Sequence, residues 1–126
     1  MGTDMLDAAA AVAAAAAGVE EDDLAMQLVN RVPLTGQAAE AGEARYYRLQ
    51  VPVGVRSLSL RTYGGSGDVS LYVDRERVPT TTSYALASQR PGNAEALVIS
   101  NPAPGTYFLR VQAVAAANAV TVLAAY

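Results

Sequence analysis

From about residue 26 onward, apolar and polar residues alternate along the chain. Large apolar side chains recur at every second position in four runs, at residues 47–51, 58–60, 69–73 and 107–111. A period of two places successive side chains on opposite faces of an extended backbone, so each run predicts a half-buried β-strand. We expect one more strand from Ala119 to Tyr126, the last residue of the sequence.

Turn-forming residues separate these runs at intervals of about ten residues. Glycine, proline, asparagine and aspartate favour turns because they tolerate or fix unusual backbone angles. About eight short antiparallel strands separated in this way predict an all-β fold, with two sheets packed as a β-sandwich. The segments richest in these residues are 52–54, 64–68, 79–83, 91–93 and 101–105.

The first part of the chain has a different pattern. Residues 8–17 are nine alanines and one valine, and Gly18 follows them. Alanine is the strongest helix former and glycine a common helix terminator, so we expect a short helix within residues 1–18. A run of ten apolar residues is too short to span a bilayer. The sequence thus divides into this helix, an acidic linker at 19–25 and a β-sandwich at 26–126.

Composition removes several classes of function. The chain contains no histidine and no cysteine. Without an imidazole it cannot form a Ser-His-Asp or Cys-His catalytic centre, and it lacks the usual zinc ligands. Metals that prefer oxygen ligands, such as calcium, remain possible in chemical terms. We therefore expect no catalytic residue in this chain.

Charge is divided unevenly along the sequence. Residues 1–30 hold six acidic and no basic residues, whereas residues 31–126 hold nine arginines and six acidic residues. The resulting charge of +3 over the second part is too dilute for recognition of phosphate backbones. We do not expect a nucleic acid as a partner.

Five segments, in their order and spacing, resemble the bacterial pre-peptidase C-terminal domain over about residues 26–126. This resemblance implies a jelly-roll-like sandwich without catalytic residues, attached to secreted bacterial proteases and often removed during maturation. In related collagenases, comparable modules bind matrix protein. Two positions depart from the family pattern: Ser70 replaces an aspartate, which leaves a carboxylate pair incomplete, and Arg31 replaces a turn glycine, which suggests a different turn. The five segments are 28–36, 46–52, 64–73, 92–95 and 104–111.

The N-terminal segment has a resemblance of its own. Residues 2–12 are similar to the closing segment of subtilisin-like serine protease domains, with Asp4 in the place of a glycine. The order of the two segments is the one that such a protease would show. We infer that the chain is a C-terminal fragment of a secreted protease, with the parent catalytic domain as a partner.

The acidic linker suggests a metal site. Glu20, Asp22 and Asp23 cluster in one short segment, and Glu43 lies in a following loop. Oxygen ligands in a flexible segment suit calcium, and Glu20, Asp22 and Asp23 resemble a linker motif of collagen-binding relatives. The alternative is a solvated, self-repelling linker. Calcium is the one cofactor that the sequence suggests.

A second candidate site comes from the strand positions that alternate with the core. Tyrosine and arginine dominate protein-binding surfaces because each buries a large area and keeps a polar end. A face that gathered several of them could hold an extended protein substrate or the parent catalytic domain. The alternative is ordinary cross-strand pairing on an outer sheet face. The residues are Tyr46, Arg48, Arg61, Tyr63, Tyr72, Phe108 and Arg110.

Two hypotheses for function follow. The first is a non-catalytic accessory domain of a secreted subtilisin-like serine protease, which assists maturation or secretion or holds protein substrate. The second is a carbohydrate-binding or matrix-binding module of another exported hydrolase. Retention on protein or on insoluble polysaccharide would separate them.

Overall fold

The structure, a computed structural model, describes residues 25–126 and contains eight β-strands in this part of the chain. The prediction of an all-β fold with about eight strands is confirmed. The predicted helix in 1–18 and most of the predicted linker lie outside the described residues. The strands are β1 (Met26–Gln27), β2 (Leu34–Ala39), β3 (Ala44–Val51), β4 (Ser57–Tyr63), β5 (Ser66–Arg75), β6 (Leu86–Ser88), β7 (Glu95–Ser100) and β8 (Gly105–Ala125).

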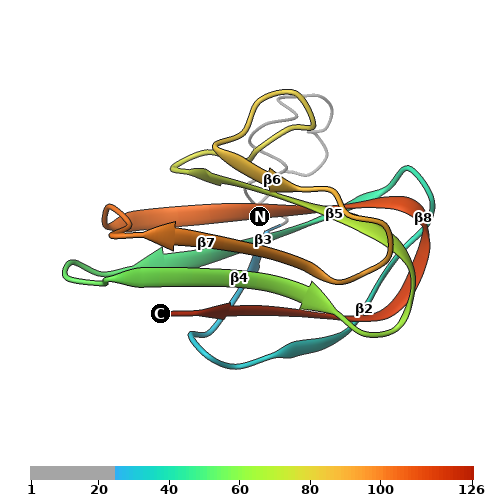
Figure 1. Cartoon of the computed structure of the whole chain (residues 1–126), viewed down its shortest axis with the longest axis horizontal. Helices are drawn as coiled ribbons and strands as arrows, with labels where there is room; N and C mark the ends of the chain where they lie inside the picture. The colour runs from blue at the N-terminus through green and yellow to red at the C-terminus, as the bar shows by residue number, and fades with distance from the viewer. Residues whose placement is uncertain (1–24) are drawn as a thin grey trace, which may run out of the picture.

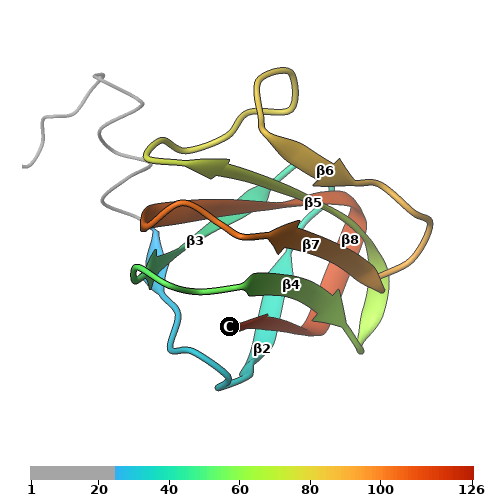
Figure 2. The ribbon, with the colours of Figure 1, turned by 60° about the vertical axis from the view of Figure 1, so that its left-hand side comes forward.

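The long strand β8 organises the fold, because it belongs to two packed layers (Figures 1 and 2). Its first half pairs with β3 and β5, and its second half pairs with β2 and β4. In the first layer the strand order is β1-β3-β8-β5-β6, and in the second it is β2-β8-β4-β7. The two layers are therefore one continuous hydrogen-bonded sheet folded over on itself.

The core lies between the two layers. It consists of the apolar side chains that point inward at every second position of the strands. From the first layer come Tyr47 and Leu49 of β3 and Leu71 of β5, and from the second come Leu58 and Leu60 of β4. All five side chains are almost fully removed from solvent. The polar neighbours of these residues occupy the two outer faces, as a period of two requires.

Two details differ from the predicted sandwich of antiparallel strands. Strand β1 pairs with β3 in parallel, with Met26 opposite Tyr47. The layers also share β8 instead of being separate sheets. The jelly-roll arrangement that the resemblance implies stays a prediction. Within residues 25–126 the structure contains no helix of the length and apolarity needed to cross a membrane.

The link between β4 and β5 carries the chain from the second layer to the first. It is shorter than the predicted turn at 64–68, because β5 already begins at Ser66. Gly64 and Gly65 have φ angles of 80° and 69°. A β-carbon on Gly65 would lie 2.0 Å from the carbonyl oxygen of Asn118 in β8. Glycine is required here both by the left-handed backbone and by the close approach of β8.

Asp68 binds the loop that precedes β7 and not its own turn. Its Oδ1 accepts a hydrogen bond from the backbone N–H of Gly92 at 3.0 Å, and the Val69 N–H donates to the Gly92 carbonyl at 3.0 Å. The Asn93 side chain donates to the Gly64 carbonyl at 2.9 Å. The two glycine-containing segments that carried the resemblance thus bind each other, which gives them a structural role.

Arg31 has the left-handed backbone conformation that glycine favours, and the different turn that its residue type suggests stays a prediction. Its φ is 68°, in the left-handed region, which costs a residue with a β-carbon about 1–2 kcal/mol. The Arg31 N–H donates to the Ala124 carbonyl at 2.8 Å, and its Nε donates to the Tyr126 carbonyl at 2.9 Å. These bonds to the end of the chain offset the backbone strain.

Candidate functional site

Five of the seven predicted surface residues share the outer face of the first layer, which we call the tyrosine–arginine face. Strand register brings them together: Tyr46 of β3 lies opposite Arg110 of β8, and Arg110 lies opposite Tyr72 of β5. In the next row, Phe108 lies between Arg48 and Asp74. The members of the face are Tyr46, Arg48, Tyr72, Phe108 and Arg110.

The two arginines of this face are held in place by neighbouring side chains. The guanidinium carbon of Arg110 lies 5.3 Å from the ring centroid of Tyr46, and its Nε donates to Gln112 Oε1 at 2.9 Å. Arg48 Nε donates to Gln27 Oε1 of β1 at 3.2 Å. Because the guanidinium groups are already oriented, a partner that binds them orders fewer free rotamers.

Two members of the face are largely covered. Tyr72 is 6% exposed and Phe108 is 8% exposed. Residues 76–85 leave β5 and return to β6, and Tyr84 near their end places its ring centroid 5.1 Å from that of Tyr72, with the rings inclined at 57°. Alternation correctly indicates the sheet face of Tyr72 and Phe108, but it cannot indicate that neighbouring groups cover that face.

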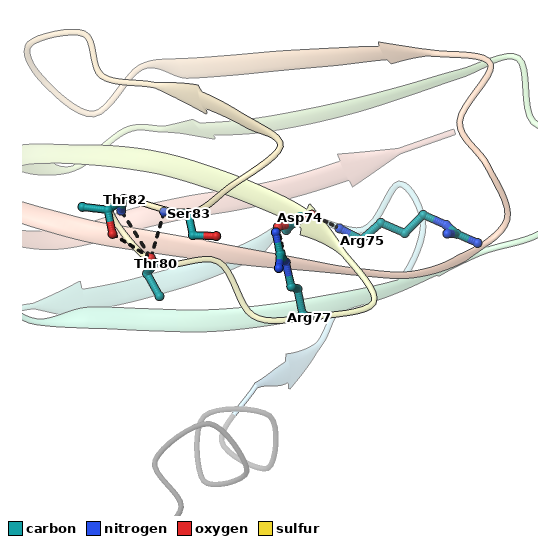
Figure 3. Close-up of polar contacts among 6 residues, drawn as sticks. All are labelled: Asp74, Arg75, Arg77, Thr80, Thr82 and Ser83. Atoms are coloured by element: carbon teal, nitrogen blue, oxygen red, sulfur yellow. Dashed lines mark hydrogen bonds and ion pairs between the residues drawn. The ribbon is translucent and has the colours of Figure 1, made fainter.

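The segment 76–85 is anchored by polar contacts at its start and in its middle (Figure 3). Asp74 accepts hydrogen bonds from the Arg77 Nε and from the Arg75 backbone N–H, both at 2.8 Å. The Thr80 hydroxyl accepts from the backbone N–H groups of Thr82 and Ser83 at 3.2 and 2.9 Å. These bonds stabilise the segment that carries Tyr84.

Tyr84 is a member of the candidate site that sequence reasoning missed. It is 39% exposed, so it presents an aromatic ring where the covered Tyr72 does not. No alternating run contains Tyr84, so the period of two does not indicate it. Its position directly after the threonine and serine run at 80–83 is the only signal in the sequence.

The remaining two predicted surface residues lie elsewhere. Arg61 and Tyr63 belong to β4 and occupy the outer face of the second layer, since Leu58 and Leu60 of that strand point into the core. The Arg61 guanidinium carbon lies 5.5 Å from the Tyr63 ring centroid. The seven predicted residues therefore form two separate patches on opposite sides of the molecule.

The predicted calcium site is only partly described by the structure. Glu20, Asp22 and Asp23 lie outside the described residues. Glu43 accepts a hydrogen bond from the Glu40 backbone N–H at 2.9 Å, and its Oε1 lies 3.6 Å from Arg45 Nη2. Among residues 25–126 no three acidic side chains lie close enough together to hold a metal ion. The calcium site stays a prediction.

One buried tyrosine has an altered acidity. The Tyr47 hydroxyl donates to Gln37 Oε1 at 2.7 Å. Burial disfavours the phenolate and raises the pKa of Tyr47 to about 12, against a smaller opposing effect of Arg45. Tyr47 is thus a neutral hydrogen-bond donor at ordinary pH, and it ties β3 to the neighbouring edge strand β2.

Three relatives are named as proteases, and each is longer than this chain. An extracellular protease of Xanthomonas campestris pv. campestris is 38% identical over 99 residues, which are 79% of this chain and 17% of the relative. Alkaline serine exoprotease A of Vibrio alginolyticus is 31% identical over 100 residues, 79% of this chain and 18% of the relative. A zinc metalloprotease of Helicobacter pylori is 33% identical over 89 residues, 71% of this chain and 34% of the relative. The chain thus spans less than a fifth of the first two proteins.

Solved structures share the fold. The solution structure of vEP C-ter 100 has a TM-score of 0.66 and 29% identity, and the match covers 80% of this chain and 99% of that one. The pre-peptidase C-terminal domain of a collagenase from Bacillus anthracis has a TM-score of 0.60 and 14% identity, covering 79% of this chain and 93% of that one.

The family match agrees with both comparisons. The family model described as the bacterial pre-peptidase C-terminal domain matches residues 43–113, from the turn before β3 through the first half of β8. It includes four of the five segments on which the resemblance rested, all but 28–36. The chain belongs to the bacterial pre-peptidase C-terminal domain family.

Proposed function

We propose that this chain is the accessory domain of a secreted subtilisin-like serine protease and that it holds protein substrate or assists maturation and secretion. The observation that carries the proposal is that most of the chain matches a minor part of two proteases, one of them named a serine exoprotease. The resemblance of residues 2–12 to the end of a subtilisin-like domain favours that class of parent enzyme.

The variety of the relatives bears on the role of the domain. One relative is named a zinc metalloprotease, whose chemistry differs from that of a serine protease. A domain found in both metalloproteases and serine proteases is expected to act on a feature that the two classes of enzyme share. Both classes of enzyme act on protein substrates, which supports a role outside the catalytic step.

The tyrosine–arginine face is the surface that we assign to protein binding. Tyr46, Arg48 and Arg110 are partly exposed on it, and Tyr84 extends it over β5. Tyrosine and arginine supply large contact areas with polar ends, and such residues carry much of the binding energy at protein interfaces. An arginine already placed against a tyrosine ring presents both groups together.

Retention on insoluble material tests the proposal. The chain should be retained on insoluble denatured protein and should pass through cellulose and chitin. Replacing Tyr46, Tyr84 and Arg110 together by alanine should weaken retention at least about tenfold. The double replacement of Arg61 and Tyr63 by alanine, on the opposite face, is the matched control and should leave retention unchanged.

Two outcomes would contradict parts of this proposal. Retention on polysaccharide but not on protein would favour the alternative function, a carbohydrate-binding module of another exported hydrolase. If the triple variant were retained on protein as strongly as the unchanged chain, the proposed function would stand. The tyrosine–arginine face would then not be the binding surface. The role in export needs the parent protein: deleting residues 26–126 should lower its activity in the medium without lowering its synthesis.

A further inference from the structure

Strand β7 forms a regular and open edge of the second layer. Its six residues pair with β4 without a register shift, from Glu95 opposite Thr62 to Ser100 opposite Ser57. In residues 25–126 no strand pairs with its other side, and the neighbouring β6 pairs with β5 in the first layer. Figure 2 shows β7 at the border of its layer beside β4.

The hydrogen-bond pattern identifies which backbone groups of β7 face the open side. The Asn101 N–H donates to the Arg56 carbonyl at 2.7 Å, one step beyond the last assigned pair. In an antiparallel ladder every second pair is hydrogen-bonded, so Leu97 and Ile99 direct their backbone groups toward β4. Ala96, Val98 and Ser100 direct theirs away from it. The open edge therefore offers three donors and three acceptors.

An apolar slot lies next to this edge. It has a volume of about 280 Å³ between β6 and β7, and Leu86 and Ile99 line it from the two strands. Val73 and Tyr107 line it as well, while Asp74 and Arg75 supply polar groups. Side chains of a strand alternate between two faces. A strand laid along β7 would direct every second side chain into the space between the layers.

We propose that β7 binds an extended polypeptide by strand addition, with apolar side chains of that segment entering the slot between β6 and β7. An extended backbone is the partner that offers donors and acceptors at the repeat of the open edge, and this mode of peptide recognition draws affinity from main-chain bonds and specificity from alternate pockets. The partner is thus an extended segment in which apolar residues alternate with polar ones.

The segment comes from a protein substrate and not from a second copy of this chain. The open edge spans six residues, whereas a stable interface between two folded proteins takes about 20–30 residues from each side. A short edge suits a flexible peptide that needs few contacts. The inference rests on the proposed role in holding protein substrate, and it places the bound segment at the edge of the sandwich, away from the tyrosine–arginine face.

The experiment uses a labelled peptide of alternating valine and serine with a lysine at each end. Fluorescence anisotropy should show saturable binding to the chain. Amide exchange followed by NMR should show that Ala96, Val98 and Ser100 exchange rapidly in the free chain and at least about tenfold more slowly in the complex. Leu97 and Ile99 are the internal control, because their N–H groups are bonded to β4 in both states.

Two matched variants separate the main-chain contact from side-chain contact. Val98→Pro removes an edge donor without removing a bond to β4, and edge strands tolerate proline; it should weaken peptide binding at least about tenfold. Val98→Thr keeps the donor and the β-branched shape and should bind within about twofold of the unchanged chain. The same peptide with four consecutive N-methyl groups should not bind, and it leaves the fold of the chain untouched.

The outcomes distinguish this inference from the proposed function. Binding that N-methylation of the peptide leaves intact, or equal protection of all β7 amides, would overturn strand addition. If at the same time the alanine variant of the tyrosine–arginine face loses retention on protein, the proposed function stands without the β7 edge. Concentration-dependent dimers that Val98→Pro abolishes, together with no peptide binding, would assign the edge to a second copy and overturn the inference.

Discussion

The two borders of the second layer differ in a way that bears on function. Strand β2 pairs with β8 through only three assigned pairs, with register shifts before and after Gln37, and Gly36 within it has a φ of 72°. Strand β7 pairs with β4 over its whole length without a shift. Bulges and irregular pairing are a common means of blunting a sheet edge against unwanted partners.

The fold therefore protects one edge of the second layer and leaves the other open. Tyr47 additionally ties β2 to the first layer through Gln37, so β2 is irregular but held. Strand β7 is uncharged from Ala96 to Ser100, contains no proline and carries Val98 at 61% exposure. A regular edge of this composition favours association, and its presence beside a protected edge is consistent with use as a binding site.

The largest effect should come from breaking the link that holds the two layers together. In Gly65→Ala the new β-carbon would lie 2.0 Å from the Asn118 carbonyl oxygen, and we expect a loss of at least about 3 kcal/mol in the free energy of unfolding. Gly36→Ala in β2 is the control, because its φ is equally positive but no atom lies within 4 Å. It should cost about 1 kcal/mol. Urea unfolding measures both, and equal losses would contradict the steric account.

A smaller effect should come from releasing the start of β7. Glu95 is 1% exposed, and its Oε1 accepts hydrogen bonds from Ser88 Oγ at 2.5 Å and from the Arg90 N–H at 3.0 Å. Glu95→Ala leaves both donors without that acceptor, so we expect a loss of about 2 kcal/mol. Glu95→Gln keeps an acceptor oxygen and should lose less.

Amide exchange should locate that effect on one edge. In Glu95→Ala the amides of Leu97 and Ile99 should exchange faster, while those of β2 should keep their rates. If the amides of β2 also exchanged faster by the same factor, the two edges would open as one cooperative unit. The claim that they differ would then be contradicted.

A third test concerns the tether of β2. Tyr47→Phe removes the bond to Gln37 and should lower the free energy of unfolding by about 1 kcal/mol at pH 7. Because burial raises the pKa of Tyr47 to about 12 from 10, the folded state keeps the proton between these values while the unfolded state loses it. The stability of the unchanged chain should therefore be constant with respect to this group below pH 10 and fall between pH 10 and 12.

The Tyr47→Phe variant lacks this titration and should show a flatter profile over the same alkaline range. Thermal unfolding at a series of pH values compares the two. Parallel profiles above pH 10 would show that Tyr47 is not the group responsible.

The smallest effect concerns calcium. Glu43 lies in the turn between β2 and β3, so an ion held by Glu20, Asp22, Asp23 and Glu43 would stabilise the β2 side. For an affinity in the millimolar range, calcium at about 2 mM should add about 0.5 kcal/mol. Magnesium and the Glu43→Gln variant are the controls. If the unfolding midpoint did not change with calcium, the predicted calcium site would be contradicted.

Sequence patterns predicted what depends on local periodicity and missed what depends on tertiary partners. The period of two correctly placed Leu49, Leu60 and Leu71 in the core. It also gave the sheet face of Tyr72 but not its burial, because the covering ring of Tyr84 comes from a segment without periodicity. The division of the arginine and tyrosine positions between two faces depends on which layer each strand joins, and no local signal specifies that.

The partners of the polar residues likewise depend on tertiary packing. Asp68 directly follows the glycine-rich turn, yet it accepts a backbone hydrogen bond from Gly92 and not from that turn. Residue type specifies the kind of partner that a side chain needs. Which of several glycine-containing loops supplies that partner is decided by the packing of the layers. The open edge of β7 was missed for a related reason, since strand order decides which strand is at a border.

The shared strand β8 has a consequence for when this domain folds. It is the last strand in the chain and the interior strand of both layers. Until its residues have left the ribosome, β3 lacks its antiparallel neighbour and β4 retains only the border strand β7. The pairings it closes are distant in sequence, and such contacts form slowly. The domain is therefore expected to complete its fold only once β8 is present, because both layers depend on that strand.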